Sequence, residues 1–365
     1  MQKFRKAFRR LPDPRAGNAS HDLLEVLFIA LAAVLCGAGS CAEMEEFGQS
    51  KEGLLRLFLR LEHGIPSHDT FSRVFRLLKP QAFELAFRRF MMAFAKANEL
   101  KLTGVIAVDG KALRRAYERG GQATPLHLVN VFAVEARMAL AQQKAPGRNE
   151  TAAALEVLDL LCLEGCTVTA DALHCHRDFA AAVLKRGGHY VLTIKANRGS
   201  LFKAVTQHFA RSGKRSHAQQ TEHPAHDRSE ARRATVMRNT TLAERFPGVA
   251  AVGRVTSRRR LHGQRAGLPV VRYYLLSKYI SPKRLLYVAR SHWAIENQLH
   301  WMLDVNFAED RNRSRKDNAP ENLAILRRLA LNIQRANPDR KSIRRKIKRA
   351  GWDDAFLMQT LSHMR

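Results

Sequence analysis

Three acidic side chains stand where carboxylates could act together on a phosphodiester bond. Asp109 follows the wholly apolar run 105–108, and Asp171 follows the run 167–170, so each aspartate ends a predicted buried strand. Side chains at the carboxyl ends of neighbouring strands meet at one mouth of a sheet. Either aspartate alone would be read as a turn former or a helix cap. Two in equivalent settings favour a shared site.

Glu296 is the third acid, within a long predicted helix that runs from Pro282 to Asp304. At helical spacing one face of this helix carries His292, Trp293, Glu296 and His300. An acid between aromatic and imidazole groups is unusual for a solvated face, which favours a functional role. The alternative is a helix whose tryptophans are core and whose glutamate pairs with Arg290 or Lys283.

Such a set suits metal-assisted phosphodiester chemistry. Two divalent ions about 3.5–4 Å apart, held by carboxylates, can activate an attacking oxygen and stabilise a leaving one. We therefore predict that Asp109, Asp171 and Glu296 are catalytic and ligate two divalent metal ions. Their carboxylates are expected to converge within one metal-binding radius, beside an open basic groove.

The charge of the chain points to a polyanionic partner. It has 62 Lys and Arg against 33 Asp and Glu among 365 residues, a net charge of +29. Such an excess favours nucleic acid over a merely well-solvated basic protein. The side chains expected just beyond the strand ends, where phosphates would run, are Lys111, Arg114, Lys195, Asn197 and Arg198. The alternative for these five is ordinary surface charge.

The composition also excludes some classes of protein. No apolar stretch reaches the roughly 18–20 residues needed to span a bilayer, and the basic start MQKFRKAFRR is not followed by a signal-peptide core. An odd count of five cysteines without export signals predicts reduced thiols. We expect a cytoplasmic, nucleoid-associated protein with no membrane contact.

The order of predicted elements indicates an α/β (α+β) fold. Strands are predicted at 105–108, 126–134, 138–144, 167–170 and 190–195, with helices at 150–162 and 177–185. Three strands followed by alternating helix and strand is the order of a ribonuclease H-like mixed sheet. This catalytic domain is assigned to residues 99–210 and 281–337, interrupted by a β-rich insertion at 211–280 with strands predicted at 233–237 and 270–276. A further helix is predicted at 321–335, and a basic C-terminal tail at 338–365.

Residues 1–98 read as a helical N-terminal domain. Helices are predicted at 22–36, 51–61, 70–78 and 81–96, the third capped by Ser67-His68-Asp69. Exposed Arg73, Arg76, Arg88 and Arg89 would allow this domain to bind DNA. A packing or dimerisation role is equally open.

Several motifs resemble bacterial insertion-sequence transposases of the H-repeat-associated group. Residues 109–114 (DGKALR) and 169–174 (TADALH) resemble its first two catalytic motifs, and 290–310 (RSHWAIENQLHWMLDVNFAED) its third. Residues 318–331 (NAPENLAILRRLAL) and 349–354 (RAGWDD) also match, and the segments DPRAGNASHDLLEVL and GIPSHDTFSRVF resemble the helical domain that accompanies these enzymes.

The resemblance implies a DDE transposase that uses two Mg²⁺ ions, with Mn²⁺ as a substitute, and acts on double-stranded DNA, both element ends and target. Hydrolysis would free a 3′-OH, which then attacks target DNA, and pairing of two ends implies a homodimer. A related superfamily carries Tyr, Arg and Lys around the glutamate, where this chain has Ala289, His292 and Leu303. Contacts with DNA are then expected from Arg290, His292, Trp293 and Asn297, including base stacking by the tryptophan.

Two other functions remain open from the sequence. The first is a structure-specific nuclease on the same scaffold, which would cleave without joining. The second is a retired transposase kept only as a DNA-binding protein. The presence of Asp109, Asp171 and Glu296 argues against the second without excluding it.

Overall fold

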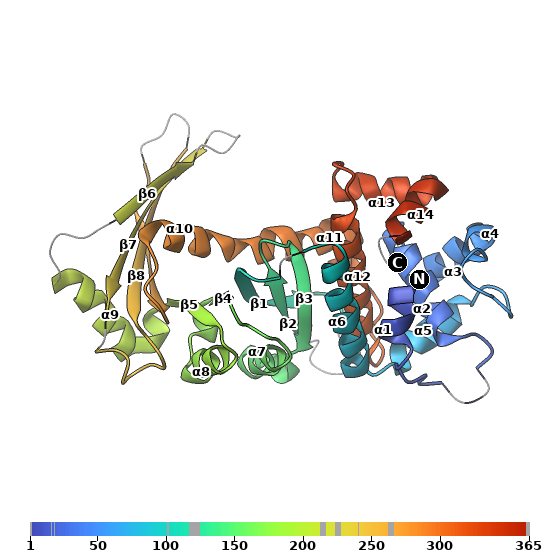
Figure 1. Ribbon diagram of the computed structural model, residues 1–365, viewed down its shortest axis with the longest axis horizontal. Coiled ribbons are helices and arrows are strands. Elements are labelled where there is room, and N and C mark those ends of the chain that lie inside the picture. Colours follow the sequence, from blue (N-terminus) through green and yellow to red (C-terminus); the bar gives the residue numbers. More distant parts are fainter. Residues whose placement is uncertain are drawn as a thin grey trace.

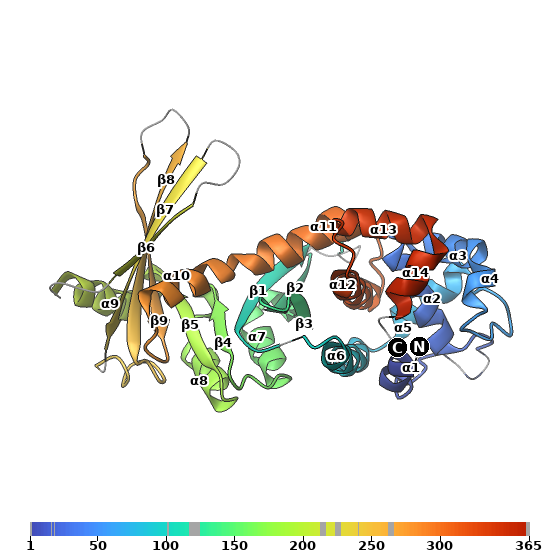
Figure 2. The same ribbon diagram turned by 45° about the horizontal axis from the view of Figure 1, so that its top comes forward.

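The computed structural model describes residues 2–362, except 16, 18, 101, 117–124, 212–216, 223–227, 240 and 262–265. The described chain is elongated, with a helical module at one end, a sheet in the middle and a β-wing at the other (Figure 1). A long broken helix runs across the sheet and links the two ends (Figure 2).

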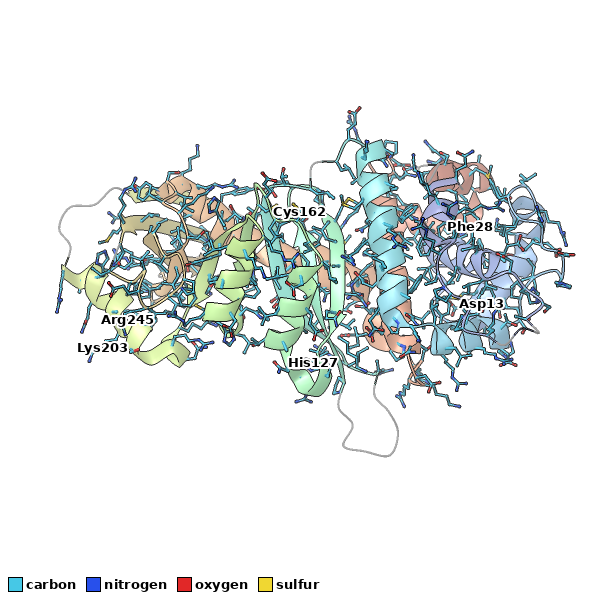
Figure 3. All side chains as sticks on the ribbon, turned by 60° about the horizontal axis from the view of Figure 1, so that its bottom comes forward. Asp13, Phe28, His127, Cys162, Lys203 and Arg245 are labelled. Atoms are coloured by element: carbon cyan, nitrogen blue, oxygen red, sulfur yellow. The ribbon has the colours of Figure 1, made fainter. Side chains whose placement is uncertain are left out.

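The helical module opens the chain. Its helices are α1 (Gln2–Phe8), α2 (Leu23–Leu35), α3 (Cys41–Ser50), α4 (Glu52–Leu55), α5 (His68–Leu77) and α6 (Pro80–Ala97). Helix α2 is apolar on all sides and is almost fully buried, with Phe28 inside the module (Figure 3). The Asp22 side chain caps α2, and the predicted Ser67 cap of α5 is confirmed, since its hydroxyl accepts from the Thr70 N–H.

The helix predicted at 51–61 is wrong for most of its length. Only Glu52–Leu55 is helical, and a helix not predicted, α3, precedes it. The cause is a tertiary contact: the Glu25 carboxylate accepts from the backbone N–H groups of Arg60, at 2.7 Å, and Leu61. Leu61 also adopts a left-handed φ of 47°, which a continuing helix does not allow.

Nine strands are found in the described part of the chain, and they form one mixed sheet. In sequence they are β1 (Val105–Leu113), β2 (Leu126–Ala133), β3 (Met138–Lys144), β4 (Thr167–Ala170), β5 (His189–Ile194), β6 (His217–Glu222), β7 (Arg228–Arg238), β8 (Ala251–Leu261) and β9 (Val270–Leu276). Their order in the sheet is β3-β2-β1-β4-β5-β9-β8-β7-β6. The pairs β1–β4 and β4–β5 are parallel and the others antiparallel. The ribonuclease H-like mixed sheet predicted from element order is confirmed.

Strand β1 is longer than predicted. It runs past Asp109 to Leu113 because β2 continues to pair with it, from Ile106↔Ala133 to Leu113↔Leu126. Strand β4 leaves β1 earlier, after the pair Val108↔Ala170. Asp109 therefore lies within the ladder between β1 and β2, but just beyond the end of the ladder between β1 and β4.

The β-rich segment predicted as an insertion at 211–280 extends the same sheet. Strand β9 pairs with β5, and β8, β7 and β6 follow outward to form the wing (Figure 2). The sequence analysis identified strands within β7 and β9 but missed β6 and β8. Strand β8 ends in Arg258-Arg259-Arg260, all exposed, so its outer half lacks the apolar alternation of a half-buried strand.

Helices cover both faces of the sheet (Figure 1). The main ones are α7 (Glu150–Asp159), α8 (Arg177–Lys185), α9 (Gly199–Arg211), α10 (Pro282–Ser291), a π turn (Ile295–His300), α11 (Trp301–Phe307) and α12 (Ala319–Ala336). Ile106 and Val108 pack with α7 and α8, whereas Ala107 lies in the core formed with the π turn, α11 and α12. Alternation along β1 therefore directs Asp109 to the face with the π turn.

Residues 338–365, expected as a basic tail, are largely helical. Helices α13 (Ile343–Trp352) and α14 (Asp354–Ser362) bury Ile347, Leu357 and Leu361 in the core of the helical module. Arg344, Arg345 and Lys348 of α13 are exposed, whereas Lys346 is buried and donates to the Gln334 and Asn337 carbonyls. The many basic residues of α13 explain why composition alone suggested a tail.

Two further sequence predictions can be compared with the fold. All five cysteines are free, as predicted. Within the described residues no helix is long and apolar enough to cross a membrane.

Candidate active site

The two aspartates lie side by side on neighbouring parallel strands. Val108 and Ala170 form the last paired position of β1 and β4, and Asp109 and Asp171 are the next residue of each chain segment. Asp171 then turns the chain, because its carboxylate accepts the Leu173 N–H at 2.7 Å and caps a short 3₁₀ turn. Asp171 can therefore form this turn and still face a functional site.

Glu296 lies above the same part of the sheet, in the π turn. This turn contacts β1 and β2, and Ile295 and Leu299 anchor it in the core while Glu296 stays exposed. A π turn inside a longer helix is often found at a functional site. The structure therefore places Glu296 on the same face of the sheet as Asp109.

The charges of Glu296 and Asp171 affect the ionisation of Asp109. Burial, together with the negative charges of Glu296 and Asp171, raises the pKa of Asp109 to about 7, against a lowering hydrogen bond from the Gly110 N–H. Among the described residues, however, no group of three His, Cys, Asp or Glu side chains is close enough to hold one metal ion. Glu296 and Asp171 lie close enough to Asp109 to raise its pKa, but the three carboxylates do not converge within one metal-binding radius, although the sequence had led us to expect that they would.

The donor set still fits a divalent cation. Carboxylate oxygens are the ligands of Mg²⁺ and Mn²⁺, and Asp109 is destabilised as an anion by the two other carboxylates. Glu296 is exposed, so its side chain is free to rotate toward the aspartates. A cation bound between them would remove the repulsion.

A fourth carboxylate, Glu150, was missed by the sequence analysis. It begins α7, and its charge also raises the pKa of Asp109. Its carboxylate packs so closely on Gly110 that a Cβ there would overlap it, and its Oε1 lies 3.2 Å from Nδ1 of His127. In the sequence Glu150 looks like an ordinary acid in the first turn of a helix, so no local signal could have identified it.

His292 is mostly buried rather than available to phosphate. Burial lowers its pKa to about 4 despite the opposing charge of Asp171, and its ring hydrogen-bonds the backbone of Thr169. It is therefore neutral, and it lies between the helix and β4. This position argues against the DNA contact predicted for it.

Lys111 also differs from its prediction. It lies inside β1 rather than beyond its end, and its side chain is only 7% exposed, with Nζ 2.7 Å from Asp304 and 3.6 Å from Asp310. Its ammonium group is thus used within the fold. Arg114 follows β1, is exposed, and lies 3.5 Å from Asp310.

The other predicted contacts lie where a polyanion could reach them. Lys195 follows β5 and is exposed, while Asn197 donates to the Ala172 carbonyl at 3.2 Å and Arg198 contacts Nδ1 of His176 at 2.7 Å. This group borders the loop after Asp171. Across the site, on the broken helix, the exposed residues are Arg290, Trp293 and Asn297.

The arginines predicted for DNA binding in the helical module are partly occupied. Arg76 pairs with Asp317 at 2.7 Å, and Arg88 donates to the Leu160 carbonyl at 2.7 Å. Both contacts join the module to the part of the chain that carries the sheet. Arg73 and Arg89 remain exposed.

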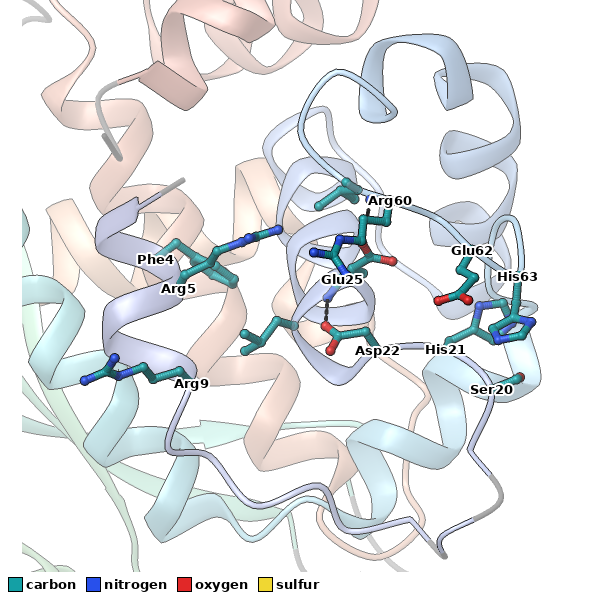
Figure 4. A pocket seen from close by; sticks show the side chains of 12 residues that line it. Phe4, Arg5, Arg9, Ser20, His21, Asp22, Glu25, Arg60, Glu62 and His63 are labelled. Carbon is teal, nitrogen blue, oxygen red and sulfur yellow. Dashed lines mark hydrogen bonds between the residues drawn. The ribbon is translucent and has the colours of Figure 1, made fainter.

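A separate pocket of about 470 Å³ lies in the helical module (Figure 4). Arg5 of α1 and Arg9, just after that helix, line it, together with the capping residue Asp22 and Glu25 of α2. Both acids already serve the local fold, Asp22 as a cap and Glu25 as an acceptor for the Arg60 N–H. None of the three acids near the sheet belongs to this pocket.

Comparison with known proteins gives a consistent result. A family model described as "Transposase DDE domain" matches residues 101–333, and one described as "DDE_Tnp_1-associated" matches residues 5–91. The chain is 31% identical over 363 residues to "Putative transposase YncI" of Escherichia coli O157:H7, covering 96% of this chain and 92% of that protein. It is 29% identical over 381 residues to "H repeat-associated putative transposase YhhI" of E. coli K12, covering 99% and 98%.

Two more similarities complete the comparison. A protein of Xanthobacter autotrophicus, "Uncharacterized protein in dhlA 3'region", is 38% identical over 269 residues, covering 70% of this chain and 89% of that protein. A solved structure titled "Cryo-EM structure of piggyBac transposase synaptic complex with hairpin DNA" matches with a TM-score of 0.41 and 13% identity, covering 100% of this chain and 77% of that one.

Proposed function

The chain belongs to the family of DDE transposases, and from this premise we propose that it cuts DNA at the ends of an insertion sequence and joins them to target DNA. The predicted resemblance to H-repeat-associated transposases is confirmed by the similarity to YhhI over nearly the whole chain. The proposed catalytic residues are Asp109, Asp171 and Glu296.

The observation that carries this proposal is the raised pKa of Asp109. Burial raises it to about 7, and Glu296 and Asp171 contribute through their charges, although the three lie far apart in sequence. Folding has therefore gathered excess negative charge at one sheet mouth in a chain of net charge +29. A divalent cation is the partner that such a pocket favours.

In this proposal the three carboxylates would hold two Mg²⁺ ions, and Mn²⁺ would substitute. Bound there, the ions would supply charge stabilisation for the attacking and leaving oxygens. The two aspartates would hold the ions from the sheet, and the exposed Glu296 would complete the set from the helix side.

The reaction consists of two in-line displacements at phosphorus. In the first, a water oxygen bonds to phosphorus and the P–O3′ bond at the element end breaks, which leaves a 3′-OH. In the second, that 3′-OH attacks a target phosphodiester, and the displaced target oxygen takes up a proton. Each step exchanges one P–O bond for another, so no oxidant or energy source is required.

The route proposed for DNA passes between two groups of side chains, all exposed except Arg198, which is half-buried. Lys195 and Arg198 border the aspartates on one side, and Arg290, Trp293 and Asn297 lie on the helix opposite. The cations would position the backbone, and Trp293, 49% exposed, could stack on an unpaired base. We propose that two copies of the chain act together, since two element ends are joined.

The test uses purified full-length protein, Mg²⁺ and labelled duplexes taken from the two DNA segments that flank its coding sequence. Wild type should yield cleaved ends and strand-transfer products, and Asp109→Ala should abolish both while retaining DNA affinity. Asp178→Asn, an exposed aspartate of α8, serves as the matched control. Cleavage without joining would identify a nuclease, and equal inertness of wild type and Asp109→Ala would identify a DNA-binding protein only.

A further inference from the structure

A buried chain of polar side chains runs from helix α12 to the candidate active site. Arg328 donates to Glu309 at 2.8 Å and, through Nε, to Oδ1 of Asn130 at 2.7 Å. The amide of Asn130 lies 3.4 Å from Nε2 of His300, and Nδ1 of His300 lies 3.8 Å from Oδ2 of Asp109. Arg328 and Glu309 are 1% exposed and Asn130 is fully buried, so solvent does not compete for these contacts.

The amide of Asn130 can be oriented in only one way. Arginine has donors only, so the atom of Asn130 facing Arg328 is its oxygen. Its NH₂ group then faces both the Leu128 carbonyl and Nε2 of His300, each at 3.4 Å. Both amide hydrogens and the amide oxygen thereby have partners.

This orientation fixes the proton on His300. An NH₂ group can only donate, so Nε2 of His300 must accept and carries no hydrogen. In the neutral ring the proton then resides on Nδ1, the nitrogen that faces Asp109. The arginine of α12 thus determines, through one amide, which nitrogen of His300 presents a donor to the carboxylate.

We propose that His300 is a positioning residue for Asp109, held in its Nδ1–H tautomer by Asn130 and Arg328. This proposal rests on the proposed function. A distance of 3.8 Å exceeds a hydrogen bond, and rotation of the Asp109 carboxylate would close it. With Oδ2 turned to His300, the other oxygen is directed to a cation, which is the usual effect of a donor behind a ligating group.

The alternative is that these polar side chains only satisfy one another's hydrogen bonds in the core. The contacts of Arg328 go beyond that role. Arg328 already has Glu309 and the Ala324 carbonyl, at 2.8 and 2.9 Å, yet it also orients the amide of Asn130. The two readings differ in what they require of His300: packing needs only its volume, whereas positioning needs a donor at Nδ1.

The first test reads the tautomer directly. Nitrogen-15 NMR of histidine-labelled full-length protein, with the His300 signals assigned by comparison with His300→Gln, should show a neutral ring protonated at Nδ1 at about pH 7.5, near neutrality. A ring protonated at Nε2, or an imidazolium ion, would overturn the proposal. In Asn130→Asp the carboxylate accepts from Nε2, so the Nδ1–H neutral form should disappear.

The second test separates donor from volume. In His300→Asn the amide nitrogen can occupy the place of Nδ1, whereas in His300→Gln the amide reaches only the place of Nε2. Binding of Mn²⁺ followed by electron paramagnetic resonance should weaken about tenfold or more in His300→Gln, and His300→Asn should stay within about threefold of wild type. Equal weakening in both variants, with unchanged thermal unfolding, would show a packing role and refute the proposal.

Failure of this inference is distinguishable from failure of the proposed function. If wild type binds Mn²⁺ and joins DNA ends while His300→Gln matches it, only the positioning role is lost. If wild type neither binds Mn²⁺ nor cuts DNA, the proposed function itself fails, although the tautomer of His300 can still be read.

Discussion

Glu84 offers a sharp test of how the helical module is joined to the sheet. It lies in α6, is 5% exposed, and its Oε1 accepts the backbone N–H of Gln142 in the edge strand β3 at 3.1 Å. Its Oε2 has no hydrogen-bond partner in the described structure. A carboxylate in this position serves as the missing neighbour of an edge strand. We predict that Glu84→Gln removes a pH dependence of stability that this junction creates.

The sign follows from the shift in pKa. Burial raises the pKa of Glu84 from 4.5 to about 8, against the lowering effects of the Gln142 N–H and of Arg88 and Arg328. The native state therefore keeps a proton that the unfolded state releases above pH 4.5, so stability falls as pH rises toward 8. At 1.36 kcal/mol per unit the loss between pH 5.5 and pH 8 is about 3 kcal/mol.

The assay is urea unfolding, followed by circular dichroism, across this range of pH. Glutamine keeps the acceptor for Gln142 but cannot ionise. Wild type and Glu84→Gln should have similar stability at the acidic end, and the variant should be more stable by about 3 kcal/mol near pH 8. Glu46→Gln, at an exposed position of α3, should follow wild type. Parallel curves for wild type and Glu84→Gln would refute the reasoning, because they would mean that Glu84 is not protonated in the folded protein.

Two further substitutions test the junctions around the sheet by urea unfolding. Lys111→Met leaves the acids beside Asp304 without their buried counter-charge and should lower the free energy of unfolding by about 3 kcal/mol. Arg76→Met breaks an ion pair whose side chains are 39% and 50% exposed, and should lower it by less than about 1 kcal/mol. Equal losses in the two variants would contradict this prediction. Asn332→Leu removes the amide that bonds both the N–H and the carbonyl of Ala139, at 3.0 and 2.8 Å, and should cost about 2–4 kcal/mol. An unchanged free energy of unfolding would show that water replaces the amide.

Much of the central fold could be predicted because its signals are local. The run 105–108 is wholly apolar, as a buried strand requires, and the periodic segments 177–185 and 321–335 match α8 and the body of α12. Both aspartates were proposed for the same reason: an acid directly after a predicted buried strand is visible in the sequence. Glu296 was proposed from its place beside aromatic and imidazole side chains on a predicted helix, and the family motif includes the same residue.

The features that were missed depend on partners distant in sequence. Lys111 reads as a free cation because Asp304 and Glu309, which surround it, are nearly 200 residues away. Glu150 reads as an ordinary helix-start acid because only the fold places it on Gly110. Helix α13 reads as part of a basic tail because half of its residues are Lys or Arg, and its burial depends on the face offered by α2 and α12.

The π turn shows most clearly where sequence periodicity fails. An unbroken α-helix would place His292, Glu296 and His300 on one stripe, yet the two histidines point inward and Glu296 is exposed. A turn with i→i+5 bonding accommodates one extra residue, which advances side-chain direction by about 100° relative to regular helix. This change lets α10 bury Leu285 against the sheet and α11 bury Leu303 against α12, while Glu296 stays at the site. The two aspartates are thus positioned by regular strand endings, and the glutamate by an irregularity that both flanking helices require.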